Sequence, residues 1–293
     1  MRNLRYQILR FVTLATLLIL TSVTPVVATT IYNNLTPNNL MAVATRPDTA
    51  GSFEIEAGDD FILGSRSLIN TASFTGIIVP GTGGTPSVSD VVVEIYRVFP
   101  LDSNTVRTPN VPTRTNSPSD VAFDSKDSAA SGLTFNTSVL AGTFTALNSV
   151  QPGGIHPKPN QTTLGNGPLT GQEVQFDITF SIPFDLPPDH YFFIPQVVLT
   201  NGGQFYWLSA SRPISGAGTT PFLPDLQTWT RDAGLDPDWL RVGTDIVGGA
   251  TPPTFNAAFS LTGEPVPEPS TMLLLGSGLL GLAGYGRKKF FKK

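Results

Sequence analysis

The sequence predicts an all-β fold, most simply an antiparallel β-sandwich, with jelly-roll-like connections as one form of it. Val174, Phe176, Ile178, Phe180 and Ile182 alternate with polar residues, and this period of two is typical of a strand with one face buried. Clusters of glycine and proline separate several such segments, as turns do. No convincing amphipathic helix lies between them, and parallel neighbours would need crossover helices. Two packed antiparallel sheets are therefore expected.

Eight segments are expected to form strands. They are residues 53–63, 67–79, 88–99, 133–147, 174–182, 191–200, 204–211 and 255–262. Three connections, 100–132, 148–171 and 212–254, are longer than a compact domain usually contains. We expect these connections either to contain short additional strands or to carry the function.

Residues 1–28 are typical of a secretory signal peptide. Arg2, Arg5 and Arg10 supply a positive end, an apolar segment follows over 11–20, and small residues precede a cleavage point after Ala28. Signal peptidase is the expected partner at this site. The alternative is an N-terminal anchor that is retained, although the apolar segment is short for a membrane span.

Residues 265–293 have three parts in a fixed order. Pro267, Glu268 and Pro269 should keep the chain extended, because proline fixes φ and removes a backbone donor. A run without charges over 272–285 predicts a helix, and its 14 residues would span about 21 Å against a hydrocarbon core of about 30 Å. The basic cluster that follows should stay on the cytoplasmic face; it consists of Arg287, Lys288, Lys289, Lys292 and Lys293. Such a segment is either a short anchor or a transient membrane stop.

This tail, with VPEPST before a helix rich in glycine and leucine and a basic end, resembles the PEP-CTERM sorting signal of Gram-negative bacteria. The resemblance implies recognition by the membrane protease and transpeptidase exosortase, with processing near Pro267, Glu268 and Pro269. It also implies an inner-membrane intermediate, then the cell surface or extracellular matrix, often in connection with exopolysaccharide and biofilm. The resemblance covers about a tenth of the chain. An ordinary C-terminal anchor is the alternative.

The segment between the two ends, residues 29–264, is expected to be the exported β domain. The chain has 18 basic and 22 acidic residues, of which this segment keeps 10 and 21. Such an acidic domain is a poor partner for nucleic acid. The chain has no cysteine, so the fold must be stable without disulfides.

The residues favour a non-catalytic protein, with an envelope hydrolase as one alternative. The two histidines, His156 and His190, lie outside any recognised catalytic or zinc-binding pattern. A hydrolase would require a pocket in which one of them meets a carboxylate or a serine at hydrogen-bond distance.

No cofactor is expected, apart from one weak calcium hypothesis. Asp120, Asp124 and Asp127 place three carboxylates in one loop, and carboxylate oxygens are ligands that calcium prefers. The pairs Asp59 with Asp60 and Asp236 with Asp238 are similar candidates. Solvated loop acids are the simpler interpretation of all of them.

A carbohydrate-binding module is the second alternative function. Trp229 and Trp239 lie in the long connection after residue 212 and are freer to be exposed than Trp207, which lies within an expected strand. An exposed aromatic ring in a groove would indicate sugar contact, whereas buried rings would indicate a packing role.

Overall fold

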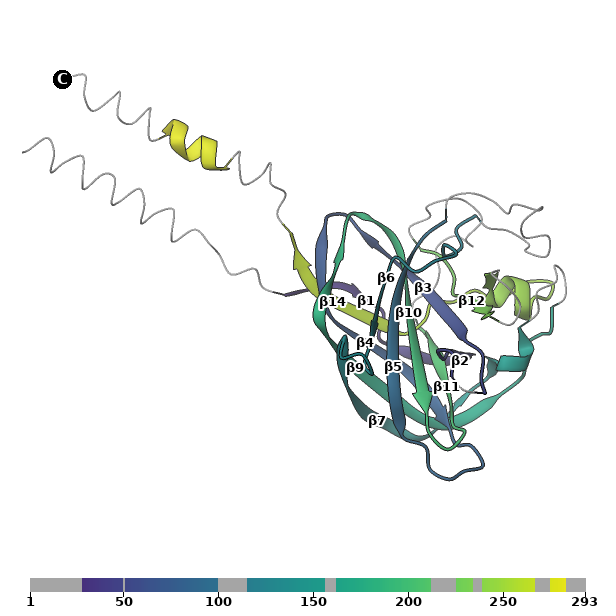
Figure 1. The fold of residues 1–293 in the computed structure, drawn as a ribbon. Helices are drawn as coiled ribbons and strands as arrows, with labels where there is room; N and C mark the ends of the chain where they lie inside the picture. Colours follow the sequence, from purple (N-terminus) through teal and green to yellow (C-terminus); the bar gives the residue numbers. More distant parts are fainter. Residues whose placement is uncertain are drawn as a thin grey trace, which may run out of the picture. The chain divides into compact units, whose positions relative to one another are not determined.

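The computed structural model describes residues 28–49, 51–99, 115–155, 162–211, 225–233, 239–266 and 275–282. One unit covers Thr29–Gly263, and a second comprises Met1–Ala28 with Glu264–Lys293. In the second unit, residues 275–282 are helical, within the run expected to form a helix (Figure 1). Within the described ranges, no helix combines the length and the hydropathy that a membrane crossing requires.

Two packed sheets build the unit Thr29–Gly263 (Figure 1). The first has eight strands: β1 (Thr29–Asn33), β14 (Phe259–Pro265), β4 (Ser67–Val79), β11 (Gln204–Ala210), β2 (Pro37–Ala44) and β8 (Asn148–Val150) in this order, with β9 (Leu169–Leu186) beside β4 and β7 (Leu133–Ala146) beside β9. The second has six, in the order β13 (Leu240–Arg241), β12 (Trp229–Asp232), β3 (Ile55–Leu63), β10 (Asp189–Leu199), β5 (Val88–Arg97) and β6 (Asp124–Asp127). Two short helical segments, η1 (Pro152–Gly154) and η3 (Val242–Val247), lie in connections.

The main core lies between the two sheets and is rich in aromatic rings. Phe74 of β4 stacks on Phe176 of β9 with ring centroids 4.8 Å apart. Phe193 of β10, in the other sheet, stacks on Phe259 of β14 at 5.0 Å, and the edge of Trp207 also meets Phe259. These contacts join strands of both sheets. Because stacked and edge-on ring pairs add to the free energy of burial, this aromatic layer holds the sandwich together without disulfides.

The structure confirms the expected β-rich architecture of two packed sheets. All eight expected segments contain strands, and the long connections contain β6, β8, β12 and β13. Two further strands, β1 and β2, were not predicted from the sequence. Antiparallel pairing is also confirmed among the described pairs except between β2 and β8, which run parallel.

Ile182 is the exception to the predicted alternation in β9. The expected core face holds for Val174, Phe176, Ile178 and Phe180, which are buried, but Ile182 is 72% exposed. The register explains the difference, because Thr71 of β4 pairs with Thr179 while Ile69 pairs with Phe184. Three extra residues of β9 therefore lie in a bulge, and Ile182 lies in that bulge.

Candidate functional site

The strongest candidate site is a carboxylate cluster on the outer face of the six-stranded sheet, made by Glu54, Glu56 and Glu94. Glu56 alternates in β3 with Ile55 and Ala57, which face the main core, and Glu94 alternates in β5 with core residues in the same way. Successive side chains of a strand point to opposite faces, so both glutamates point away from the main core. One carboxylate oxygen from each of the three lies within 4.8 Å of the others.

A smaller apolar cluster covers part of this outer face. Its residues come from β5, β10, β12 and the segments that flank β12; they are Tyr96, Val98, Phe192, Ile194, Leu226, Trp229 and Trp239. These side chains shield one side of the carboxylates. Glu56 is consequently fully buried, whereas Glu54 and Glu94 keep part of their surface exposed.

Arg231 of β12 is the cation of the cluster. Its Nε donates to Oε2 of Glu56, its Nη1 to the backbone carbonyl of Asp120 at 3.2 Å, and its Nη2 to the hydroxyl of Tyr96 at 3.0 Å. The guanidinium carbon also lies 4.7 Å from the ring centroid of Trp239. Every nitrogen of the guanidinium thus has a partner, and the stacked rings fix its plane.

Two buried side-chain oxygens, one in the cluster and one on a residue beside it, have no hydrogen-bond donor among the described residues. They are Oε1 of Glu56 and Oε1 of Gln196, and both side chains are fully buried. Gln196 belongs to β10, the strand between β3 and β5, and its amide nitrogen donates to Oε1 of Glu54 at 3.0 Å. Buried acceptors without a donor are rare in folded proteins.

Burial and mutual repulsion disfavour the ionised forms of the clustered carboxyl groups. Burial raises the pKa of Glu56, although Arg231 opposes the shift. Burial, followed by the charges of Glu56 and Glu54, raises the pKa of Glu94 to about 8. The neighbouring carboxylates therefore oppose one another's ionisation, and the attraction of Arg231 does not remove this effect.

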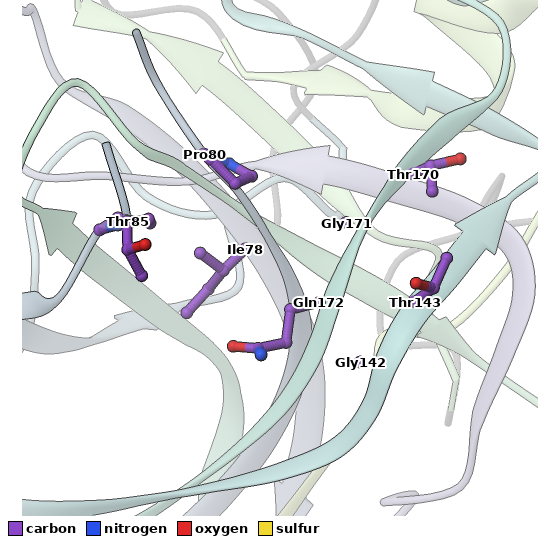
Figure 2. Close-up of a pocket in the computed structure, with 9 residues that line it drawn as sticks. Ile78, Pro80, Thr85, Gly142, Thr143, Thr170, Gly171 and Gln172 are labelled. Carbon is purple, nitrogen blue, oxygen red and sulfur yellow. The ribbon is translucent and has the colours of Figure 1, made fainter. Parts of the chain in front are cut away.

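A shallow pocket of about 240 Å³ lies elsewhere, against β4, β7 and β9. Figure 2 shows the side chain of Gln172 beside Ile78, with Thr85, Thr143 and Thr170 around them. The residues that line it carry no ionisable side chain. It therefore offers neither the acid and base of a hydrolase nor the charged ligands of a metal site.

The predicted calcium ligands do not meet in the part of the chain described. Asp124 binds Lys126, with 3.0 Å between Oδ2 and Nζ, and Asp127 accepts the backbone N–H of Ala129 at 2.6 Å. The single group of three acids close enough to share an ion, within the described ranges, is Glu54, Glu56 and Glu94 and does not include Asp120. The acid cluster thus lies on β3 and β5 and just before β3, and the sequence analysis did not predict that these glutamates lie together.

Of the two roles left open for Trp229 and Trp239, the structure shows packing and not exposure. Trp229 is 1% exposed and Trp239 fully buried, and the indole N–H of Trp239 donates to the carbonyl of Ser119 at 3.1 Å. Both rings belong to the outer apolar cluster. They pack the segment around β12 onto the sheet instead of presenting a face to a sugar.

His190 meets part of the condition set for a hydrolase. Its Nε2 lies 2.6 Å from Oδ2 of Asp60, and both side chains are buried. Nδ1 of His190 has no hydrogen-bond partner among the described residues, so no serine there completes a nucleophilic site. Asp60 also accepts the backbone N–H of Leu226 at 2.8 Å, which makes the pair an anchor for the segment that leads into β12.

Asp59, the neighbour of Asp60, faces the main core. It accepts the backbone N–H of Ala257 at 2.8 Å and lies 3.3 Å from the hydroxyl of Thr228. Burial, followed by the charge of Asp60, raises the pKa of Asp59 well above its ordinary value. Neither member of this aspartate pair is available as a surface metal ligand.

Several predicted residues lie outside the described ranges. These are the signal peptide before Ala28, the motif Pro267, Glu268 and Pro269, the basic cluster 287–293, His156, and the pair Asp236 and Asp238.

Comparison with known families gives one match. The PEP-CTERM protein-sorting motif matches residues 265–288, so the chain carries this sorting signal at its C-terminal end. The motif implies an exported protein that is sorted to the cell surface and processed by exosortase. No family matches the β domain, and comparisons with curated proteins and with solved structures found no match.

Proposed function

We propose that this protein is a non-catalytic component of the envelope or extracellular matrix of a Gram-negative bacterium, delivered there by its C-terminal signal. The PEP-CTERM motif over residues 265–288 carries the proposal. In the proposed route, signal peptidase cleaves after Ala28 and the segment over 272–285 halts export in the inner membrane. Exosortase then processes the chain near Pro267, Glu268 and Pro269.

The position of the motif relative to the fold supports this route. The last strand of the domain, β14, ends at Pro265, and the motif match begins at that residue. Processing after this point would leave every strand intact. The folded domain would then enter the matrix, where we propose that it associates with exopolysaccharide as a structural protein and not as an enzyme.

Replacing the motif's acid tests the route. Glu268→Gln should leave unprocessed precursor in the inner-membrane fraction of the native host, whereas Glu264→Gln should be processed normally. Glu264 is a matched control because it is a glutamate four residues earlier, at the end of β14. Immunoblotting of membrane, surface and medium fractions would measure both. Normal release of the Glu268→Gln protein would refute the proposed processing.

A further inference from the structure

The arginine beside the acid cluster does not bond to every oxygen of the cluster. Arg231 has its three nitrogens engaged by Glu56 Oε2, the Asp120 carbonyl and the Tyr96 hydroxyl. Oε1 of Glu56 and Oε1 of Gln196 lie buried without a donor among the described residues, an arrangement that folded proteins avoid unless a further group is bound.

We propose that Glu54, Glu56 and Glu94 bind one divalent cation of the size of calcium, with the amide oxygen of Gln196 as a neutral ligand from β10. All the atoms offered are hard oxygens, which calcium prefers. The three carboxylate oxygens lie no more than 4.8 Å apart, a span that an ion with bonds of about 2.3–2.6 Å bridges.

The charge also fits a divalent ion. Three carboxylates against one guanidinium leave two negative charges when all are ionised, and one Ca²⁺ neutralises them. An ion can reach the cluster from solvent, because Glu54 and Glu94 are only partly buried. The packing of Trp239 and Tyr96 around Arg231 keeps the buried side rigid, so binding requires little rearrangement.

Calcium titration of the full chain, purified in detergent and stripped with a chelator, tests the site. Calcium chloride should raise the thermal midpoint of unfolding saturably, because an ion that binds only the native state stabilises it. Glu94→Gln and Glu54→Gln should each weaken the affinity at least about tenfold, since charge count sets calcium affinity. These two glutamates are partly exposed, so both variants are expected to fold.

Glu173→Gln is the matched control. Glu173 is a buried glutamate of β9, in the other sheet, and its replacement should leave calcium affinity unchanged. No saturable shift up to about 10 mM calcium would overturn the proposal and would point to a proton shared by Glu56 and Glu94 in place of the ion. Unchanged affinity in both cluster variants would overturn it as well. None of these results depends on processing of the sorting tail.

Discussion

At the scale of single residues, the chain contains an ion pair that is buried and another that is exposed. Arg231 and Glu56 form an ion pair in which side-chain exposure is 13% and 0%. Arg66 and Asp185 form a second pair of the same chemistry on the surface, with 54% and 44%. The two pairs allow the effect of burial to be measured within one chain.

Arg231→Ala should lower the free energy of unfolding by about 3–5 kcal/mol, because it leaves the buried Glu56 carboxylate without a partner. Adding Glu56→Gln to that variant should recover part of the loss. Arg66→Ala should leave stability nearly unchanged, since water screens the exposed pair. Thermal unfolding of the four proteins measures this difference, and equal losses for the two arginines would contradict the buried-charge explanation.

Asp59→Asn should stabilise the protein at neutral pH, by on the order of 1 kcal/mol. Burial and the charges of Asp60 and Asp225 raise the pKa of Asp59, so the folded state holds its proton to a higher pH than the unfolded chain does. The contribution of Asp59 to stability is therefore greatest below its unfolded pKa of about 4 and falls as pH rises toward the folded pKa.

Melts of wild type and Asp59→Asn between pH 4 and 7 measure this dependence. The variant should show a flatter profile than wild type. Asp177→Asn, a partly exposed aspartate on β9, controls for the change of charge. A profile for Asp59→Asn as steep as that of wild type would show that Asp59 titrates normally.

At the scale of elements, close contact between strands limits what the sheets tolerate. A Cβ on Gly76 of β4 would lie 2.3 Å from the ring of Phe205 and 2.5 Å from the backbone oxygen of Tyr206, both in β11. Gly142 of β7 has nothing within 4 Å of the same position. The β4–β11 contact therefore requires glycine, whereas the β7 position does not.

Gly76→Ala should cost about 1–3 kcal/mol through overpacking, while Gly142→Ala should change stability by less than about 0.5 kcal/mol. Thermal unfolding of the two variants compares them directly. Similar midpoints for both would mean that β4 and β11 separate easily.

Sequence periodicity identified all strands of nine or more residues but missed the eight-residue β2, the shortest strands and the site. The alternation in β9 and β14 reports burial on one face and can be read without knowing the partner strands. β12 and β13 have four and two residues, too few to show a period. Glu56 and Glu94 are 38 positions apart in the sequence. They lie close together because β10 pairs with both β3 and β5, and a single sequence does not show which strands pair or in which register.

The tryptophans illustrate the same limit. Loop position left both exposure and packing open for Trp229 and Trp239, and both rings pack against the outer face of the second sheet. Alternation of apolar and polar residues along a strand suggests that one face of the sheet lies in the core and the other in solvent. Here part of the outer face of the six-stranded sheet is also buried, because side chains of the segment after residue 225 pack on it.

At the scale of the whole molecule, export and sorting predict the mass of the mature protein. Intact mass spectrometry of protein recovered from the envelope and medium of the native host should find an N-terminus at Thr29 and a C-terminus near Pro267, with any added glycan or lipid visible as extra mass. A C-terminus at Lys293 in the inner membrane would instead identify the tail as a permanent anchor.

The pairing of the first and last strands of the domain gives this sorting a mechanical consequence. Thr29 of β1 pairs with Gly263 of β14, and β14 lies between β1 and β4. A tension applied through the C-terminal tail would pull β14 along its own axis, against hydrogen bonds on both sides that bear the load together. A pull that separates Thr29 from Gly263 would open the β1–β14 ladder one bond at a time. A domain tethered only by its tail would thus resist shear in a moving matrix better than one held by both ends.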